Sequence, residues 1–286
     1  MKELARRWLP PPLRSLARRL YYRPGVRRVV YFPVDLVDRI LGRRRADRPP
    51  RSIAFVGDGD FDAIGREFLG HFVEIGGLRP GDRVLDVGCG AGRMAIPLIG
   101  FLGSEGTYDG FDPLPEHVRW CRERIEAFHP NFRFRHVDLK IPMYSPRGAV
   151  PPSEFRFPYP DGSFDFVFLT SVFTHMMPGA VDRYLSEIAR VSAGGARSLV
   201  TWFLLDEEAE RRMASGASPT RFGHDLGDCR VVDPKVPESA VAYREADVRA
   251  RYARAGLEIV EPIRFGQWSG RPGGASSQDI VVAVKR

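Results

Sequence analysis

The segment Val84-Leu85-Asp86-Val87-Gly88-Cys89-Gly90-Ala91-Gly92 constrains this chain more than any other feature of its sequence. It begins as an apolar strand, passes through a glycine-rich turn and leads into a helical pattern that runs toward Phe101. Glycine has no Cβ, so a ligand can lie against such a turn, and the N-terminus of the next helix offers it N–H groups. In doubly wound α/β sheets this junction is where nucleotide-like ligands bind.

The rest of the chain continues as alternating strand and helix patterns. Predicted strands cover residues 83–87, 107–111, 132–137, 164–169, 197–204, 257–265 and 279–284. Apolar residues at helical spacing lie between them, Pro97 should kink or delay the helix after the glycine turn, and Asp60 or Asp62 is expected to cap an earlier one. Strands separated by helices imply βαβ units, so we predict an α/β fold with a doubly wound, mostly parallel seven-stranded sheet and helices on both faces.

Charge divides the chain near residue 55. Residues 1–51 hold 15 Lys and Arg against 4 Asp and Glu, whereas the remainder holds 28 against 32. We expect a basic N-terminal arm, residues 1–55, that contains a short amphipathic helix around Leu13–Leu20, and one domain, residues 56–286. Its insertions 139–163 and 206–242 are too long for ordinary connections and are expected to form a substrate lid. No nucleic acid partner is expected, because the positive charge is confined to the arm.

The three cysteines, Cys89, Cys121 and Cys229, are odd in number and far apart, so neither a disulfide framework nor a CxxC motif is expected. A cytoplasmic setting is the default for such a chain. No apolar run approaches the roughly 18 to 20 residues of a membrane span, and prolines and arginines interrupt any signal-peptide core. No group of His, Cys, Asp and Glu has convincing zinc spacing, so no metal is expected.

The glycine spacing is GxGxG after an acidic residue, which departs from the GxGxxG fingerprint of dinucleotide-binding folds. With this motif the sequence resembles the class I S-adenosylmethionine-dependent methyltransferases, over about residues 60–286. The resemblance implies S-adenosyl-L-methionine as cofactor, S-adenosyl-L-homocysteine as product and an antiparallel last strand. The residues that it places at the cofactor are Asp86, Gly88, Cys89, Gly90, Gly92, Asp112, Pro113, Asp138, Leu139 and Thr170.

The resemblance also implies individual roles for these residues. The glycine turn cradles the methionine part of the cofactor with Asp86 near its amino group, and Asp112, about 20 residues further on, binds both ribose hydroxyls. Asp138, after the third strand, meets the adenine amino group. Taken singly, Asp112 is also compatible with an ordinary surface carboxylate and Asp138 with a turn cap, but their order on consecutive strands favours the cofactor.

The acceptor is expected beside the segment that follows the fourth strand, Thr170–Met176. His175 is the candidate general base, because histidine titrates near neutral pH; a packed structural histidine or a cofactor contact is the other interpretation. An aromatic-lined pocket with an arginine rim is predicted around it, although the same aromatic residues equally suit anchors for long loops. The residues assigned to substrate binding are Phe173, Tyr144, Trp202, Trp268 and Arg271.

The segment Ser171–Met176 together with Gln278-Asp279-Ile280 resembles bacterial small-molecule methyltransferases, some of which modify sugars or glycans. It implies transfer to an oxygen, less readily a nitrogen, of a small metabolite or a sugar or glycan acceptor. An inactive cofactor-binding partner subunit and a nicotinamide-dependent oxidoreductase are the alternatives. Apolar residues among the arginines of the arm, such as Trp8, Val29 and Val30, predict either peripheral contact with anionic lipid at the inner face of the membrane or a solvated or domain-packed segment.

Overall fold

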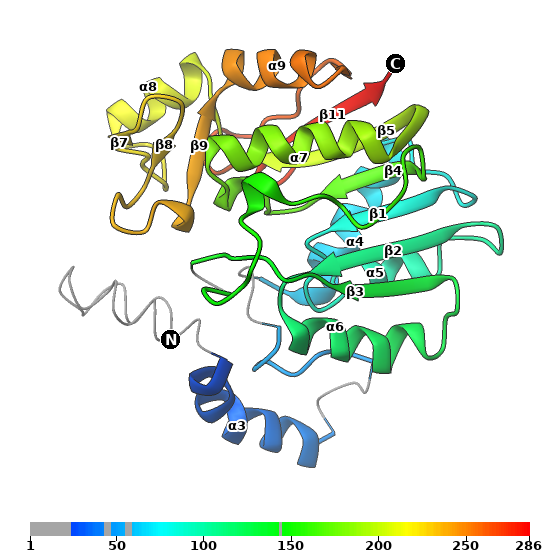
Figure 1. The fold of residues 1–286 in the computed structure, drawn as a ribbon. Coiled ribbons are helices and arrows are strands. Elements are labelled where there is room, and N and C mark those ends of the chain that lie inside the picture. The colour runs from blue at the N-terminus through cyan, green and yellow to red at the C-terminus, as the bar shows by residue number, and fades with distance from the viewer. Residues whose placement is uncertain (1–23, 43–46, 55–58, 143–144) are drawn as a thin grey trace.

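A single mixed sheet forms the centre of the molecule (Figure 1). The computed structural model describes residues 24–42, 47–54, 59–142 and 145–286. Within them the sheet has seven strands in the order β10-β11-β5-β4-β1-β2-β3. Strands β1 to β5 are parallel to one another, and β11 runs antiparallel to both β5 and β10, which confirms the predicted doubly wound sheet with an antiparallel last strand. Its strands are β1 Arg83–Val87, β2 Thr107–Asp112, β3 Phe132–His136, β4 Phe164–Leu169, β5 Ser192–Trp202, β10 Leu257–Ile259 and β11 Asp279–Lys285.

Helices cover both faces of this sheet. The longer ones are α3 Pro24–Ile40, α4 Phe61–Glu74, α5 Ala95–Ile99, α6 Pro115–Cys121, α7 Pro178–Val191, α8 Glu207–Ser215 and α9 Glu245–Arg254. Helix α6 continues as a π-helical turn, η1 Arg122–Glu126, and the 3-10 turns are η2 Pro152–Glu154, η3 Phe173–His175 and η4 Pro237–Ser239. Asp60 is the cap of α4, since its Oδ1 accepts from the Ala63 N–H at 2.7 Å. Pro97 lies in the first turn of α5, so that helix starts late, as predicted.

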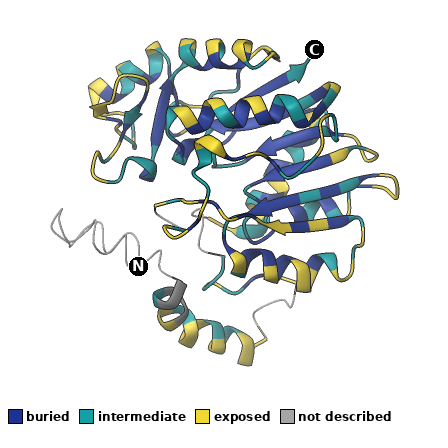
Figure 2. Ribbon diagram, in the orientation of Figure 1, coloured by how far each residue is buried: buried dark blue, intermediate teal, exposed yellow. Residues whose placement is uncertain are grey.

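The sheet separates two apolar cores, and the residues along the central strands are mostly buried (Figure 2). On one face, α4, α5 and α6 pack on the sheet, and Phe72 of α4 lies 4.3 Å from Phe168 of β4 between ring centroids. On the other face, α7 and α9 bury the predicted apolar stripe that includes Val181 and Leu185. Because both faces are covered, the carboxyl edge of the sheet is where side chains from several strands reach the surface together.

Residues 206–242 form ordered secondary structure, which the sequence analysis did not anticipate. They contain α8 and most of a second sheet, ordered β6-β9-β8-β7, with its own small apolar core that includes Met213, Phe222 and Trp268. The four strands are β6 Leu204–Leu205, β7 His224–Asp225, β8 Arg230–Val231 and β9 Val241–Arg244. Three of them have only two residues, too few to show the alternation that identifies a strand in a sequence.

One other expectation, the length of the sixth strand, differs from the structure. The sixth strand, expected over 257–265, ends at Ile259, and Pro262, which has no N–H to give to a ladder, follows it. The amphipathic helix expected around Leu13–Leu20 lies outside the described residues. The helix that the structure does describe in the arm, α3, was not predicted, and it contains Pro33, a residue that is unfavourable inside a helix.

Candidate functional site

The glycine turn crosses the carboxyl ends of β1 and β2. Gly88, Gly90 and Gly92 have φ values of 84°, 52° and 78°, a region that residues with a Cβ rarely adopt. A Cβ on Gly88 would lie 2.8 Å from Val172, and one on Gly92 would lie 2.8 Å from Ile125, whereas one on Gly90 would meet no atom within 4 Å. The turn is therefore packed against protein at both ends and open at its middle.

Strand β2 holds this turn by accepting hydrogen bonds from the N–H groups of the turn. Gly88 and Cys89 donate to the Phe111 carbonyl at 2.9 and 3.0 Å, and Gly90 donates to Oδ2 of Asp112 at 2.9 Å. These three N–H groups of the turn are therefore already paired within the protein. What the turn offers a ligand is close approach to its backbone, because the open side of Gly90 carries no side chain.

Asp86 lies under the turn with one oxygen paired and one unpaired. The Tyr108 hydroxyl donates to its Oδ2 at 2.6 Å, while its Oδ1 is buried without a hydrogen-bond partner in the part of the chain that the structure describes. Burial, together with the Asp112 charge, raises the pKa of Asp86 to about 8, against the effect of the Tyr108 hydrogen bond. An unpaired buried carboxylate oxygen is costly, so a cationic ligand group at this point would stabilise it.

Asp112, at the end of β2, joins the turn to α6. Its Oδ2 accepts from the Gly90 N–H, and its Oδ1 accepts from the Leu114 N–H at 2.9 Å. His117 of α6 also lies against it, with Nδ1 at 3.4 Å from Oδ1, and His117 Nε2 lies 3.0 Å from the Ile53 carbonyl. A carboxylate oxygen has two lone pairs, so Asp112 keeps acceptor capacity for hydroxyl donors while it holds the turn.

The structure identifies two residues at this site that the sequence analysis did not assign to it, Tyr108 and His117. Both side chains are buried. The signal for Tyr108 was available, since a tyrosine in a buried strand needs a partner for its hydroxyl. The signal for His117 was not, because its contact with Asp112 depends on how α6 leaves the end of β2.

The other expected cofactor residues lie along the same edge. Pro113 and Thr170 are half-buried at the ends of β2 and β4, and Asp138 is exposed beyond β3. Leu139 is a core side chain, so only its backbone can face a ligand. Cys89 is also buried, and burial raises the pKa of its thiol and that of the neighbouring Cys121 well above normal, which leaves both thiols weak nucleophiles.

The segment after β4 lies directly against the glycine turn. Ser171 has φ 58°, unusual for a residue with a Cβ, and its N–H donates to the Thr201 hydroxyl at 2.7 Å. Its own hydroxyl donates to Oε1 of Gln278 at 3.1 Å. Because Val172 is close to Gly88, these bonds place the expected acceptor segment beside the expected cofactor segment. Backbone strain of this kind often marks functional sites.

His175 ends the turn η3 and faces the second insertion. Its Nδ1 lies 2.9 Å from the carbonyl oxygen of Glu238 in η4. A carbonyl can only accept, so Nδ1 carries the hydrogen, and in the neutral ring Nε2 is then the basic nitrogen. The contact serves both interpretations of His175, since it fixes the ring on the insertion and also selects the tautomer that a general base needs.

Two residues expected to contact the substrate are core side chains instead. Phe173 and Trp202 have no exposed surface, and their rings pack against each other at 4.7 Å between centroids. The Trp202 indole N–H donates to the Tyr252 hydroxyl at 3.3 Å. Trp202 ends β5 and Phe173 begins η3, both at the expected edge of the sheet, but their bulky side chains point inward to the core. Tyr144, also expected here, lies outside the described residues.

Trp268 and Arg271 fix the loop between β10 and β11, which emerges at the carboxyl edge because β10 is parallel to β5. The Trp268 indole N–H donates to Oδ2 of Asp279 at 2.7 Å, and Arg271 pairs with Asp206, the cap of α8, at 2.6 Å. The Arg271 guanidinium also lies 4.2 Å from the centroid of the Phe265 ring. Both side chains therefore anchor the loop, which was the alternative interpretation of the aromatic residues.

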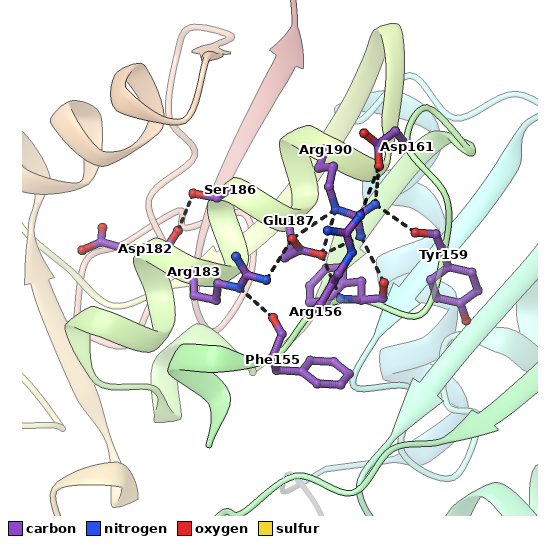
Figure 3. Close-up of polar contacts among 10 residues, drawn as sticks. Phe155, Arg156, Tyr159, Asp161, Asp182, Arg183, Ser186, Glu187 and Arg190 are labelled. Atoms are coloured by element: carbon purple, nitrogen blue, oxygen red, sulfur yellow. Dashed lines mark hydrogen bonds and ion pairs between the residues drawn. The ribbon is translucent and has the colours of Figure 1, made fainter. Parts of the chain in front are cut away.

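The end of the first insertion is attached to α7 by a buried carboxylate (Figure 3). Glu187 accepts from the Phe157 N–H at 2.8 Å and pairs with Arg190 at 2.6 Å. Arg190 also donates to the Tyr159 carbonyl and pairs with Asp161. Burial alone would raise the pKa of Glu187, but these hydrogen bonds hold the pKa below its usual range. These contacts hold residues 157–161 of the insertion against α7.

Within the residues that the structure covers, no group of three or more His, Cys, Asp or Glu side chains is placed to hold a metal ion. The residues that fit a cofactor are those of the glycine turn. The open backbone at Gly90, the unpaired oxygen of Asp86 and the Asp112 carboxylate suit a ligand that carries both an ammonium group and a ribose. S-adenosyl-L-methionine has both groups.

The fold is that of the class I S-adenosylmethionine-dependent methyltransferases. Among solved structures, the PH0226 protein of Pyrococcus horikoshii OT3 superposes with a TM-score of 0.55 at 12% identity, over 82% of this chain and 96% of that one. A SAM-dependent methyltransferase of Methanosarcina mazei superposes with a TM-score of 0.51 at 19% identity, over 74% of this chain and 96% of that one. These likenesses concern the fold.

The sequence comparison agrees with the fold. Residues 84–195, from β1 to the start of β5, match the model of the methyltransferase domain family. A sterol 24-C-methyltransferase of Gibberella zeae is 26% identical over 166 residues, which are 56% of this chain and 37% of the relative. An aklanonic acid methyltransferase of Streptomyces sp. is 30% identical over 102 residues, 30% of this chain and 46% of the relative. The chain thus spans less than half the length of these relatives, and the match supports S-adenosyl-L-methionine as the cofactor.

Proposed function

We propose that this protein is an S-adenosyl-L-methionine-dependent methyltransferase that methylates an oxygen of a small metabolite or of a sugar or glycan. The observation that carries the proposal is the unpaired, buried Oδ1 of Asp86 beneath a glycine turn that is open at Gly90. The family match over residues 84–195 supports the same activity. When bound, the cofactor supplies a methyl group already activated on a sulfonium, so the protein needs chiefly to align the acceptor and exclude water.

We assign the residues as follows. Asp86 holds the amino group, Asp112 the ribose hydroxyls and Asp138 the adenine edge, with the turn from Gly88 to Gly92 against the methionine part. His175 takes the proton of the acceptor hydroxyl at Nε2. The domain spans residues 56–286, behind an arm of residues 1–55, and the insertions 139–163 and 206–242 surround the acceptor.

Binding measurements test the cofactor assignment. Calorimetry with S-adenosyl-L-methionine, S-adenosyl-L-homocysteine and NAD is expected to show binding of the first two and none of NAD, because the turn has GxGxG spacing. Binding of NAD alone would support the oxidoreductase alternative and overturn the proposal. Production of S-adenosyl-L-homocysteine with a panel of sugars and metabolites then separates an enzyme from an inactive partner subunit. The panel should include carbon nucleophiles, because a relative is named as a C-methyltransferase.

The His175→Asn variant is expected to lose about a hundredfold or more in kcat while its affinity for S-adenosyl-L-homocysteine stays the same. Asparagine keeps an N–H donor for the Glu238 carbonyl but cannot take a proton. The matched control is His129→Asn, in the turn before β3, which should keep full turnover. Equal turnover in the His175 variant would leave only the structural interpretation of His175.

A further inference from the structure

Helix α3 exposes an apolar face that nothing in the described structure covers. Most of the exposed large apolar residues of the described chain belong to it or to the residue that follows, and none of its described residues is buried (Figure 2). They are Val29, Val30, Phe32, Val34, Leu36, Val37, Ile40 and Leu41, with Val29 76% and Ile40 72% exposed. Residues 26, 29, 30, 33, 37 and 40 recur at intervals of three and four, so they form one stripe along a helix about 25 Å long.

The opposite, polar side of α3 is attached to the rest of the chain. Asp35 accepts from the N–H groups of Arg51 and Ser52 at 2.8 and 3.2 Å, and Asp38 pairs with the Arg51 guanidinium at 3.1 Å. On a helix of 3.6 residues per turn, Asp35 lies about 170° and Asp38 about 130° from the centre of the apolar stripe. These bonds orient the helix, so its apolar stripe is turned away from the segment that leads into the domain.

The sequence on both sides of α3 is strongly basic. Residues 1–23 hold 7 Lys and Arg against 1 acidic residue, and residues 41–51 hold 5 against 1. A second copy of the chain would bring the same positive charge to the interface, and the two arms would repel each other. An anionic surface attracts these residues instead, and a planar apolar layer suits an exposed stripe rather than a groove.

We propose that the apolar face of α3, residues 26–41, docks in the plane of an anionic lipid bilayer. The aspartates on its polar side hold the domain on the aqueous side, and the positive charge of the flanking sequence attracts the anionic surface. Within the described chain no helix has both the length and the apolar character to cross a bilayer, so this contact is peripheral. The proposal stands apart from methyl transfer, because it uses no residue of the candidate site.

Vesicle flotation of the full chain tests this proposal. We expect binding to phosphatidylcholine vesicles that contain phosphatidylglycerol, and little binding to phosphatidylcholine alone or at high salt. The V37E/I40E variant should bind the anionic vesicles at least about tenfold less, because charge replaces the centre of the stripe. The single variant V29E, at another point of the stripe, should weaken binding in the same direction.

The matched control is Phe128→Glu, which changes another exposed apolar residue, 71% exposed, outside α3. It should bind vesicles as the natural protein does. Affinity for S-adenosyl-L-homocysteine, measured on every variant, should stay unchanged and shows that each is folded. Unchanged vesicle binding by V37E/I40E would overturn the proposal. So would a dimer, detected by light scattering without lipid, that V37E/I40E converts to a monomer, because the stripe would then be covered by a second copy.

Discussion

Asp112→Ala should weaken the binding of S-adenosyl-L-homocysteine at least about a hundredfold. The carboxylate accepts from the Gly90 and Leu114 N–H groups and, in the proposed function, from the ribose hydroxyls. Hydrogen bonds to a charged group contribute about 1.5 to 3 kcal/mol each, so the loss of two ligand bonds alone accounts for that factor. Loss of the Gly90 bond also frees the turn from β2, which adds to the effect. Calorimetry of the variant beside the natural protein measures it.

Asp165→Ala is the matched control for this prediction. Asp165 is also an aspartate on a strand of the sheet, but it forms an ion pair with Arg83 at the start of β1, at the amino edge. Its removal should leave cofactor affinity unchanged, since ligands of such sheets bind at the carboxyl edge. If Asp112→Ala bound the ligand as tightly as Asp165→Ala, Asp112 would be only a support for the turn.

The sequence predicted the sheet and the cofactor edge because both depend on local patterns. The apolar runs at 84–87 and 164–169 are buried on both faces and therefore visible as strands, and the glycine spacing marks the turn after the first of them. The acceptor side was predicted less well. Trp202 ends a strand as expected, but whether its ring faces the ligand or the core depends on packing against Phe173 and Tyr252, which lie far away in sequence.

The same reasoning explains the second sheet and α3. Trp268, Phe222 and Met213 form a small core only because the loop before β11 folds back on α8, and no local pattern shows that return. In α3 an apolar stripe is present in the sequence, together with Pro33, which is unfavourable inside a helix. Which side of α3 is attached depends on the bonds of Asp35 and Asp38 to Arg51 and Ser52, more than ten residues away in sequence.

Affinity for the cofactor should rise with pH between about 6 and 7.5. The pKa of Asp86 is about 8 in the ligand-free protein, so its carboxyl is mostly protonated at pH 6 and 7. An ammonium group beside Oδ1 favours the ionised form, and binding therefore releases a proton, with affinity rising by up to about tenfold per pH unit below the pKa. Proton release follows from calorimetry in buffers of different ionisation enthalpy. A flat profile, with no proton released, would mean that Asp86 does not meet the ligand cation.

Asp86→Asn should separate stability from binding. The folded pKa is raised from 3.8 to about 8, so the stability that this group contributes is fully present below pH 3.8 and is lost progressively as pH rises from there to about 8. Asparagine cannot ionise and can still accept from Tyr108, so the ligand-free variant should be more stable at pH 8, by roughly 2 to 5 kcal/mol at about 1.4 kcal/mol per pKa unit. It should bind S-adenosyl-L-homocysteine more weakly, with no rise in affinity between pH 6 and 7.5.

Urea unfolding at pH 5 and pH 8 measures the change in stability, and the gain in the free energy of unfolding should be smaller at pH 5. A variant less stable than the natural protein at pH 8 would show that the pKa of Asp86 is not raised in the ligand-free protein. A more stable variant with weaker binding would show that the buried carboxylate is kept for the cofactor, at a cost to the fold.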